Sequence, residues 1–174
     1  MFDVVRSPAE LTADFRAMGL KVTPQRQLLF RLLHGNSTHP TAEAIFDEAS
    51  TRMPGISLRT VYQTLTDLTT MGELQSFAFG GGAMRFDPNV GEHHHRVCVS
   101  CAEVGDVYVE CADLLHEACV SADVNGFTVD TTDIVFRGLC ARCAETRATA
   151  PSSSKRRVPS ISRRTTTEKS NRSQ

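Results

Sequence analysis

Apolar residues in the N-terminal part of the chain recur at helical spacing, which predicts four helices. The first spans residues 8–19, the second begins at Pro24, the third follows Thr41, and the fourth runs from Leu58 to about Met71. Because these residues recur every three or four positions, each helix has one apolar face for a shared core. The apolar positions of the last three helices are Leu28, Leu29, Leu32 and Leu33; Ile45, Ala49 and Met53; and Val61, Leu65 and Leu68.

The fourth helix has a polar face opposite its apolar one, and a β-hairpin is predicted after it. The hairpin arms are residues 73–79 and 83–86, which flank a glycine turn. This order of elements is typical of a winged helix-turn-helix, in which the last helix enters the DNA major groove. A helix followed by a hairpin is also common in domains that never contact DNA. The polar face consists of Arg59, Thr60, Tyr62, Gln63 and Thr66.

A second, smaller α/β domain is predicted after this unit. Such a small domain needs a metal or a partner subunit for stability, and its edge strands could pair across a dimer axis. Its predicted elements are strands near 95–99, 104–109 and 133–138, and a helix at about 111–124 with Cys111 and Cys119 on its apolar side.

The predicted fold class is therefore α+β, with an N-terminal winged helix-turn-helix followed by a small α/β dimerisation domain. The expected boundaries are 1–86 for the winged helix, 87–92 for a hinge, 93–147 for the second domain and 148–174 for a basic tail.

Charge is distributed unevenly along the 174 residues, although the formal net charge is only −1. Residues 151–174 contain seven Lys or Arg and one Glu, a net charge of +6, and the rest of the chain has a net charge of −7. The tail is rich in Ser and Thr and has no aromatic residue, so we expect it to be disordered. It could add non-specific attraction for nucleic acid, or have no function of its own.

Two Cys-x-x-Cys pairs give the strongest chemical signal. Because no secretory signal precedes them, a metal is favoured over disulfides. Four thiolates suit tetrahedral zinc in a closed, structural site. The alternatives are unrelated buried cysteines or a redox switch. The predicted zinc ligands are Cys98, Cys101, Cys140 and Cys143.

A second cluster combines imidazoles with carboxylates. In an extended strand His93 and His95 point to the same face, away from His94. Asp87 lies just before them, Asp106 shortly after, and His39 stands between the second and third helices. Such ligands accommodate Fe(II), Mn(II) and Zn(II). Taken singly, His39 is more typical of a loop histidine and Asp106 of a solvated strand residue.

With these motifs the chain resembles the ferric uptake regulator (Fur) family of bacterial metal-dependent repressors over roughly residues 8–145. The resemblance rests on Gly19-Leu20-Lys21-Val22-Thr23-Pro24-Gln25-Arg26, His39-Pro40-Thr41-Ala42, Thr60-Val61-Tyr62, Arg85-Phe86-Asp87, the histidine cluster and both Cys-x-x-Cys pairs.

The resemblance implies a homodimeric transcriptional repressor that binds a palindromic DNA operator. Each subunit would hold one structural zinc and one regulatory Fe(II) or Mn(II) at the hinge, with His39, Asp87, His93, His95 and Asp106 as regulatory ligands. The ion would fix the spacing of the two winged helices. The implied DNA contacts are Lys21 in the minor groove and Arg59, Tyr62 and Gln63 on the fourth helix, where a solvated polar face is the alternative.

The subtype depends on the last hinge ligand. Iron-sensing members usually have glutamate at the position of Asp106, and aspartate there resembles the peroxide-sensing (PerR-type) branch. In that branch peroxide oxidises a histidine at the position of His39 or His93 and releases the repressor from DNA. Iron sensing without peroxide sensing is the alternative.

The remaining expectations concern a third site and the setting of the protein. Some family members have a further metal site, which would match Glu92, His94, Asp113 and the region of Thr132. Thr132 is a poor ligand, so we expect that site to be incomplete and His94 to be exposed. The protein is expected to be cytoplasmic, with no membrane segment, small-molecule substrate or enzymatic activity, because five protein ligands leave little open coordination.

Overall fold

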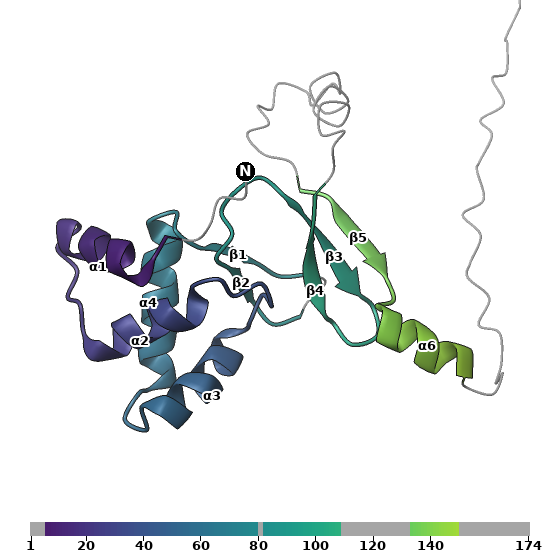
Figure 1. The fold of residues 1–174 in the computed structure, drawn as a ribbon, viewed down its shortest axis with the longest axis horizontal. Helices are drawn as coiled ribbons and strands as arrows, with labels where there is room; N and C mark the ends of the chain where they lie inside the picture. Colours follow the sequence, from purple (N-terminus) through teal and green to yellow (C-terminus); the bar gives the residue numbers. More distant parts are fainter. Residues whose placement is uncertain (1–5, 80–81, 109–132, 150–174) are drawn as a thin grey trace, which may run out of the picture.

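The computed structural model describes residues 6–79, 82–108 and 133–149. Its first part is a helical lobe followed by a two-stranded wing, and its second part is a three-stranded sheet with one helix (Figure 1). The bounds are α1 (Pro8–Ala17), α2 (Pro24–Leu33), α3 (Ala42–Arg52), α4 (Leu58–Thr70), β1 (Gln75–Phe77), β2 (Arg85–Asp87), β3 (His94–Cys98), β4 (Val104–Val107), β5 (Val135–Gly138) and α6 (Ala141–Thr149).

Each helix of the first lobe begins at a side chain that caps its N-terminus. Ser7 caps α1 in a capping box with Glu10, and Thr23 caps α2 directly before Pro24. Thr41 and Ser57 cap α3 and α4 in the same way. Each such cap contributes about 1 kcal/mol because it satisfies an amide that the helix leaves unpaired. These caps therefore fix the predicted helix starts.

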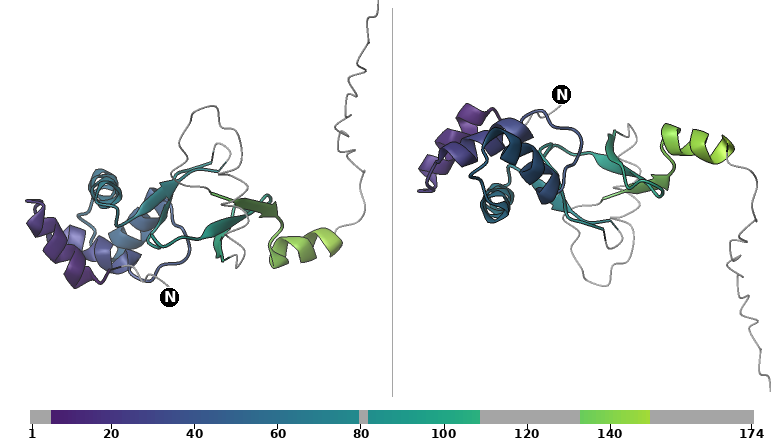
Figure 2. Two further views of the ribbon diagram at one scale, coloured as in Figure 1. Left: turned by 90° about the horizontal axis from the view of Figure 1, so that it is seen from above. Right: turned by 90° about the horizontal axis from the view of Figure 1, so that it is seen from below.

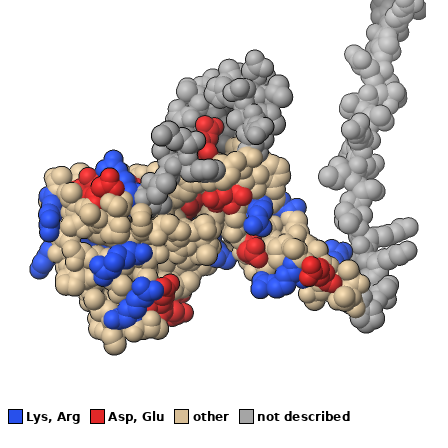
Figure 3. Space-filling view, viewed as in Figure 1, with Lys and Arg blue, Asp and Glu red and all other residues tan. Residues whose placement is uncertain are grey.

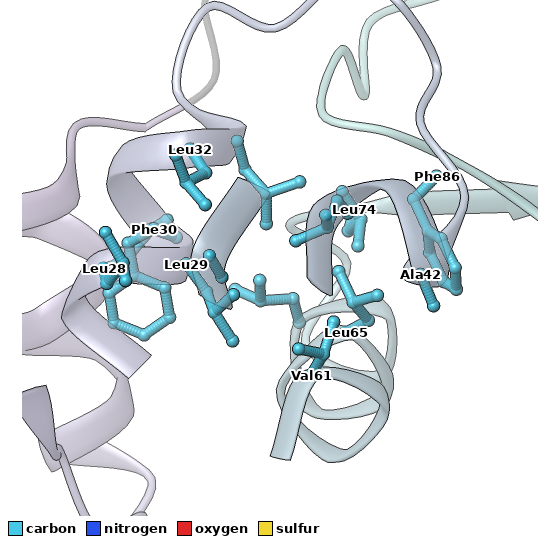
Figure 4. Close-up of a cluster of buried hydrophobic side chains, with 14 of the residues drawn as sticks. Leu28, Leu29, Phe30, Leu32, Ala42, Val61, Leu65, Leu74 and Phe86 are labelled. Carbon is cyan, nitrogen blue, oxygen red and sulfur yellow. The ribbon is translucent and has the colours of Figure 1, made fainter. Parts of the chain in front are cut away.

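One hydrophobic core holds the helical lobe together. Leu29 of α2 and Leu65 of α4 are fully buried in this core (Figure 4). Phe15 and Phe30 are also fully buried and meet edge to face, with ring centroids 4.8 Å apart. Phe86 of β2 joins the same core, so the wing is anchored to the helices.

The wing is shorter than predicted. β1 pairs antiparallel with β2, with Ser76 opposite Phe86. The expected arm at 73–79 contracts because Leu74 is buried in the helical core and the Glu73 amide still bonds to the Leu68 carbonyl of α4. β2 ends at Asp87, the first residue of the predicted hinge.

The second sheet has the order β4-β3-β5, with β3 antiparallel to β4 and parallel to β5. The wing lies between this sheet and the helices, and the views in Figures 1 and 2 agree on this arrangement. Among the described residues of the sheet, the buried apolar side chains are few: Val97, Cys98 and Val104.

The observed strands lie inside or beside the predicted ones, and α6 was not predicted. β3 begins one residue early and β5 two residues late, because their bounds follow the ladder between them, in which His95 is opposite Val135. α6 begins directly after Cys140 in a run of Ala, Arg, Glu and Thr that has no strong apolar periodicity. The predicted helix at 111–124, Cys111, Cys119 and nearly all of the basic tail lie outside the described residues.

Candidate metal centres

The predicted His/Asp cluster assembles between the wing and the second sheet, and we call these five residues the hinge site. Alternation along the chain places His93 and His95 on the same side, and the antiparallel register puts Asp106 opposite His95. His39 comes from the link between α2 and α3, and Asp87 from the end of β2. One ligand atom from each residue lies within 4.8 Å of all the others.

Three imidazoles of the hinge site converge on one carboxylate oxygen. The Oδ2 atom of Asp87 lies 2.8 Å from Nε2 of His93, 3.3 Å from Nε2 of His39 and 3.4 Å from Nε2 of His95. The Nε2 atoms of His93 and His95 are themselves 3.1 Å apart. At that distance the two Nε2 atoms cannot both carry a proton, so at least one of them directs a lone pair into the site.

The hinge site is buried, and part of its hydrogen-bonding capacity is unused. Relative exposure is 0% for His39 and 1% for Asp87. Nε2 of His39 and Oδ1 of Asp106 are 2.7 Å apart, but neither makes a hydrogen bond of acceptable geometry to a described residue. Buried polar atoms without partners are costly. Nitrogen and oxygen atoms that point at a common centre fit a divalent cation.

Nδ1 of His93 lies 2.8 Å from the Gly91 carbonyl oxygen. A carbonyl accepts only, so Nδ1 carries the proton and Nε2 keeps a free lone pair. A metal-ligating histidine is held in its tautomer by this type of contact. The backbone of the connector therefore prepares His93 as a ligand.

The electrostatics of the hinge site favour an ionised carboxylate. Burial opposes the charged form of Asp87, but the surrounding histidines and the Asn89 amide outweigh burial and hold the pKa of Asp87 well below its usual range. Burial also disfavours the charged form of His39, yet the carboxylates of Asp87 and Asp106 raise its pKa. Protons and metal ions therefore compete for His39, whereas Asp87 stays available as an anion.

Aromatic rings that sequence reasoning missed line the hinge site. The Phe77 ring lies 4.3 Å from that of His95, and the Phe79 ring lies 5.7 Å from it, measured between centroids. Tyr108 donates a hydrogen bond to Asp106 over 3.3 Å. The i, i+2 spacing of Phe77 and Phe79 in a predicted strand was the signal that could have found the first two. These rings surround the ligands with apolar surface.

The four cysteines of the two Cys-x-x-Cys pairs form a second cluster, which we call the cysteine site. All four are free thiols, and their sulfurs lie within 4.8 Å of one another. Sγ of Cys101 and Sγ of Cys140 are 3.7 Å apart. Tetrahedral zinc with Zn–S bonds of about 2.3 Å separates its sulfurs by about 3.8 Å. The geometry and the donors therefore fit zinc.

Backbone amides and crowding separate the acidities of these thiols. The amide of Cys140 donates to Sγ of Cys98 over 3.3 Å and lowers the pKa of Cys98 to about 6. The amide of Cys143 favours the thiolate of Cys140, but burial and the neighbouring sulfurs outweigh it and raise the pKa of Cys140 to about 12. Several thiolates cannot crowd together without a cation. Zinc would supply that charge.

The predicted DNA contacts lie on exposed positions of the helical lobe. Lys21 stands between α1 and α2, and Arg59, Tyr62 and Gln63 lie on the outer face of α4. Figure 3 shows basic side chains spread over this lobe with acidic ones among them. The Tyr62 hydroxyl donates to Glu43 over 2.6 Å. A role in DNA binding stays a prediction for all four.

Asp67 contacts two side chains near this surface. It pairs with Arg26 at 2.5 Å and accepts from the Gln63 amide over 2.9 Å. Arg26 also donates to the Lys21 carbonyl. Arg26 therefore makes intramolecular bonds, and its partner Asp67 connects the start of α2 with α4.

The expectation that His94 is exposed is wrong. Its relative exposure is 7%, because β3 is the central strand of the sheet and has a neighbour on both sides. Its Nδ1 atom has no hydrogen-bond partner among the described residues. Glu92 is exposed, and Asp113 and Thr132 lie outside the described residues. The incompleteness of a third metal site stays a prediction.

The chain matches known proteins along most of its length. The model of the ferric uptake regulator family matches residues 17–137. The peroxide-responsive repressor PerR of Staphylococcus epidermidis is 31% identical over 136 residues, which is 78% of this chain and 89% of that protein. No helix within 6–79, 82–108 and 133–149 is long and apolar enough to cross a membrane.

Solved structures agree in fold. The ferric uptake regulator of Helicobacter pylori superposes with a TM-score of 0.68 at 18% identity, covering 82% of this chain and 97% of that one. The ferric uptake regulator of Pseudomonas aeruginosa, solved with manganese, has a TM-score of 0.57 at 26% identity, with coverages of 75% and 97%. The predicted fold class is confirmed. The chain belongs to the ferric uptake regulator family of metal-dependent transcriptional regulators.

Proposed function

We propose that this protein is a homodimeric repressor whose hinge site binds Fe(II) or Mn(II) and thereby sets its affinity for a palindromic DNA operator. One observation carries the proposal. The hinge site takes His39 and Asp87 from the helical lobe and wing, and His93, His95 and Asp106 from the second domain. A cation that needs all five ligands binds one arrangement of the two parts better than others and shifts the population toward it.

The cysteine site has a different role in this proposal. All its ligands come from the second domain, at the end of β3 and around the start of α6. A zinc ion there closes the domain on itself and does not link it to the winged helix. One zinc and one regulatory ion would be present in each subunit.

We further propose that the regulatory ion makes the repressor peroxide-responsive. Three features support this: aspartate at position 106, the 31% identity to a peroxide-responsive repressor, and the burial of His39 and His93 within the hinge site. When Fe(II) is bound, it supplies the chemistry that activates peroxide. Addition of oxygen to His39 or His93 would remove a ligand and weaken the link that the ion makes between the two domains.

Operator binding tests this function. A duplex is first selected from a random library with Mn(II)-loaded, zinc-containing protein, and its binding is then measured with Fe(II) or Mn(II), each with and without hydrogen peroxide. We expect peroxide to release only the Fe(II)-loaded protein, with 16 Da added to His39 or His93 in mass spectrometry.

The other outcomes are equally informative. If Fe(II)-loaded protein stays on the duplex with neither histidine oxidised, peroxide sensing is wrong and iron sensing takes its place. If neither ion changes affinity for the selected duplex, the hinge site is not regulatory. The Mn(II) arm is the matched control, because it fills the same site and is far less reactive toward peroxide.

A further inference from the structure

Arg85 on β2 joins the surroundings of the hinge site to those of the cysteine site. Its Nη1 atom donates to the carbonyl oxygen of His39 over 3.2 Å, and its Nη2 atom donates to the carbonyl oxygen of Ala102 over 3.1 Å. His39 lies in the link between α2 and α3, and Ala102 lies in the turn between β3 and β4. One guanidinium therefore spans the helical lobe and the second domain.

The two carbonyls that Arg85 contacts belong to residues with an unusual backbone. Among the residues that the structure describes, the non-glycine residues with positive φ are His39, at +50°, and Ala102, at +59°. This left-handed region is unfavourable for residues with a Cβ atom and persists only where surrounding contacts hold it. The carbonyl oxygens of both residues accept hydrogen bonds from the same side chain.

Each of these residues also stands at a metal site. His39 is itself a member of the hinge site, so its backbone conformation directs its ring toward Asp87. Ala102 directly follows Cys101, and its amide bonds to the Cys98 carbonyl over 2.9 Å. That bond closes the turn that presents Cys98 and Cys101 to the cysteine site.

The backbone around Arg85 is fixed as well, so its side chain starts from a defined point. Arg85 forms an isolated β-bridge with Thr41, and the Phe86 amide donates to the Pro40 carbonyl over 3.0 Å. Phe86 is buried in the helical core. The backbone of Arg85 is thus held on the wing, while the two Nη atoms of its side chain bond to two different segments.

We propose that Arg85 is a positioning residue that holds both His39 and the Cys98–Ala102 turn in their ligand-presenting conformations, so that one side chain supports each of the two metal sites. A planar guanidinium with several donors can serve two separate carbonyls at once, which an ammonium group on a flexible stem does poorly. This inference rests on the proposed metal binding at both sites.

The first experiment separates the two sites in the full-length Arg85→Gln variant. The affinity of the hinge site for Mn(II) is measured by titrating zinc-containing protein with Mn(II). The electron paramagnetic resonance signal reports the free Mn(II) at each point. Removal of a group that holds a metal ligand commonly weakens affinity by about 10- to 100-fold. Because Arg85 acts through the backbone of His39, we expect about tenfold.

The cysteine site has its own readout, the rate of zinc transfer to a chelator. Loss of one hydrogen bond to the Ala102 carbonyl should speed transfer about 2- to 10-fold. Adding Ala102→Gly to the variant restores the wild-type rate, because glycine adopts the +59° conformation without steric cost. The same addition leaves Mn(II) affinity weakened, since His39 still lacks its contact.

Two further variants complete the design. Arg85→Lys should fold and give intermediate values at both sites. Arg52→Gln removes an exposed arginine of α3 that pairs with Glu48, so it controls for the loss of one positive charge and should change neither readout.

The results that overturn the proposal are distinct from failure of the proposed function. If Arg85→Gln and Arg85→Lys bind Mn(II) and retain zinc as the wild type does, Arg85 does not position the ligands. If they lose only DNA affinity, Arg85 is a phosphate contact instead. If the wild type binds no Mn(II) in addition to zinc, the proposed hinge function itself fails.

Discussion

The hinge site and the cysteine site contain a similar number of ligand atoms at similar separations, yet they connect different parts of the molecule. The cysteine site joins two segments of one domain, and its thiols range from buried Cys98 to exposed Cys101. The hinge site joins two domains, and four of its five residues are buried. In the proposed function, the first arrangement stabilises a domain, whereas the second would make the relation between domains depend on an ion.

The difference in ligands agrees with this division. Thiolates bind zinc tightly in a closed tetrahedron, whereas imidazole and carboxylate ligands accept exchangeable ions such as Fe(II) and Mn(II). A sensor needs an ion that leaves, and a structural site needs one that stays. Substitutions at each site and a change of pH can break or sharpen this distinction.

Cys140→Ser should have the largest effect, because it leaves three thiol ligands around a sheet whose described residues bury few apolar side chains. Structural zinc contributes about 10–16 kcal/mol to folding in the smallest zinc domains, so loss of zinc should unfold this sheet. We expect zinc content to fall below stoichiometry and the dimer to dissociate, measured by metal analysis and light scattering.

Ser100→Ala is the control. Ser100 lies between Cys98 and Cys101 but is not a thiol, so this variant should retain zinc. A Cys140→Ser protein that keeps one zinc per subunit and stays dimeric would show that the cysteine site is not structural.

Asp87→Asn should strongly weaken metal binding at the hinge site and leave the cysteine site intact. The substitution keeps the shape of the side chain but removes the charge on which three imidazoles converge. We expect Mn(II) affinity to fall by about 100-fold or more, at the upper end for groups around a metal, with zinc content unchanged. Asp47→Asn, on the exposed face of α3, is the matched control. Simultaneous loss of zinc would mean that the two sites are not independent.

The pH dependence of the hinge site should have opposite signs with and without metal. Because the pKa of His39 is raised, a proton on it stabilises the metal-free fold at low pH, and this contribution is lost as pH rises through the folded pKa. Because the pKa of Asp87 is lowered, its contribution is present above its unfolded pKa and is lost as pH falls through the folded pKa. Both contributions are therefore present between about pH 4, near the usual pKa of an aspartate, and about pH 6.5, the usual pKa of a histidine.

The affinity for Mn(II), in contrast, should increase with pH. Mn(II) must displace the proton from His39, so its affinity should fall by about tenfold per pH unit below the raised pKa of that histidine. Mn(II) titrations at several pH values, with His34→Gln as a control for an exposed histidine, measure the slope. An affinity that does not change between pH 8 and pH 5.5 would remove His39 from the ligand set.

Phe77→Leu should have the smallest effect. The substitution keeps an apolar side chain but loses the ring contact with His95. An aromatic contact of this type contributes about 0.5–1.5 kcal/mol, which corresponds to about a 2- to 12-fold change in Mn(II) affinity. Zinc transfer should be unchanged. A larger effect on zinc transfer than on Mn(II) affinity would contradict the separation of the two sites.

Much of the helical lobe could be predicted because its signals are local. Thr23, Thr41 and Ser57 cap helices that begin where the sequence predicted, and the apolar positions of α4 are buried as their spacing predicted. Strand bounds and α6 were less accessible, since they depend on pairing between distant segments and on a cysteine site that closes around the helix start.

The sequence alone determined the ligand types of both sites, because Cys-x-x-Cys spacing and the alternation of His93 and His95 act within a few residues. Only the tertiary structure decided what surrounds those ligands. The left-handed backbone of His39, the reach of Arg85 from it to Ala102, and the burial of His94 each depend on residues far apart in the chain. Such contacts leave no local pattern, since each is fixed by how the two domains pack and not by the residues beside it.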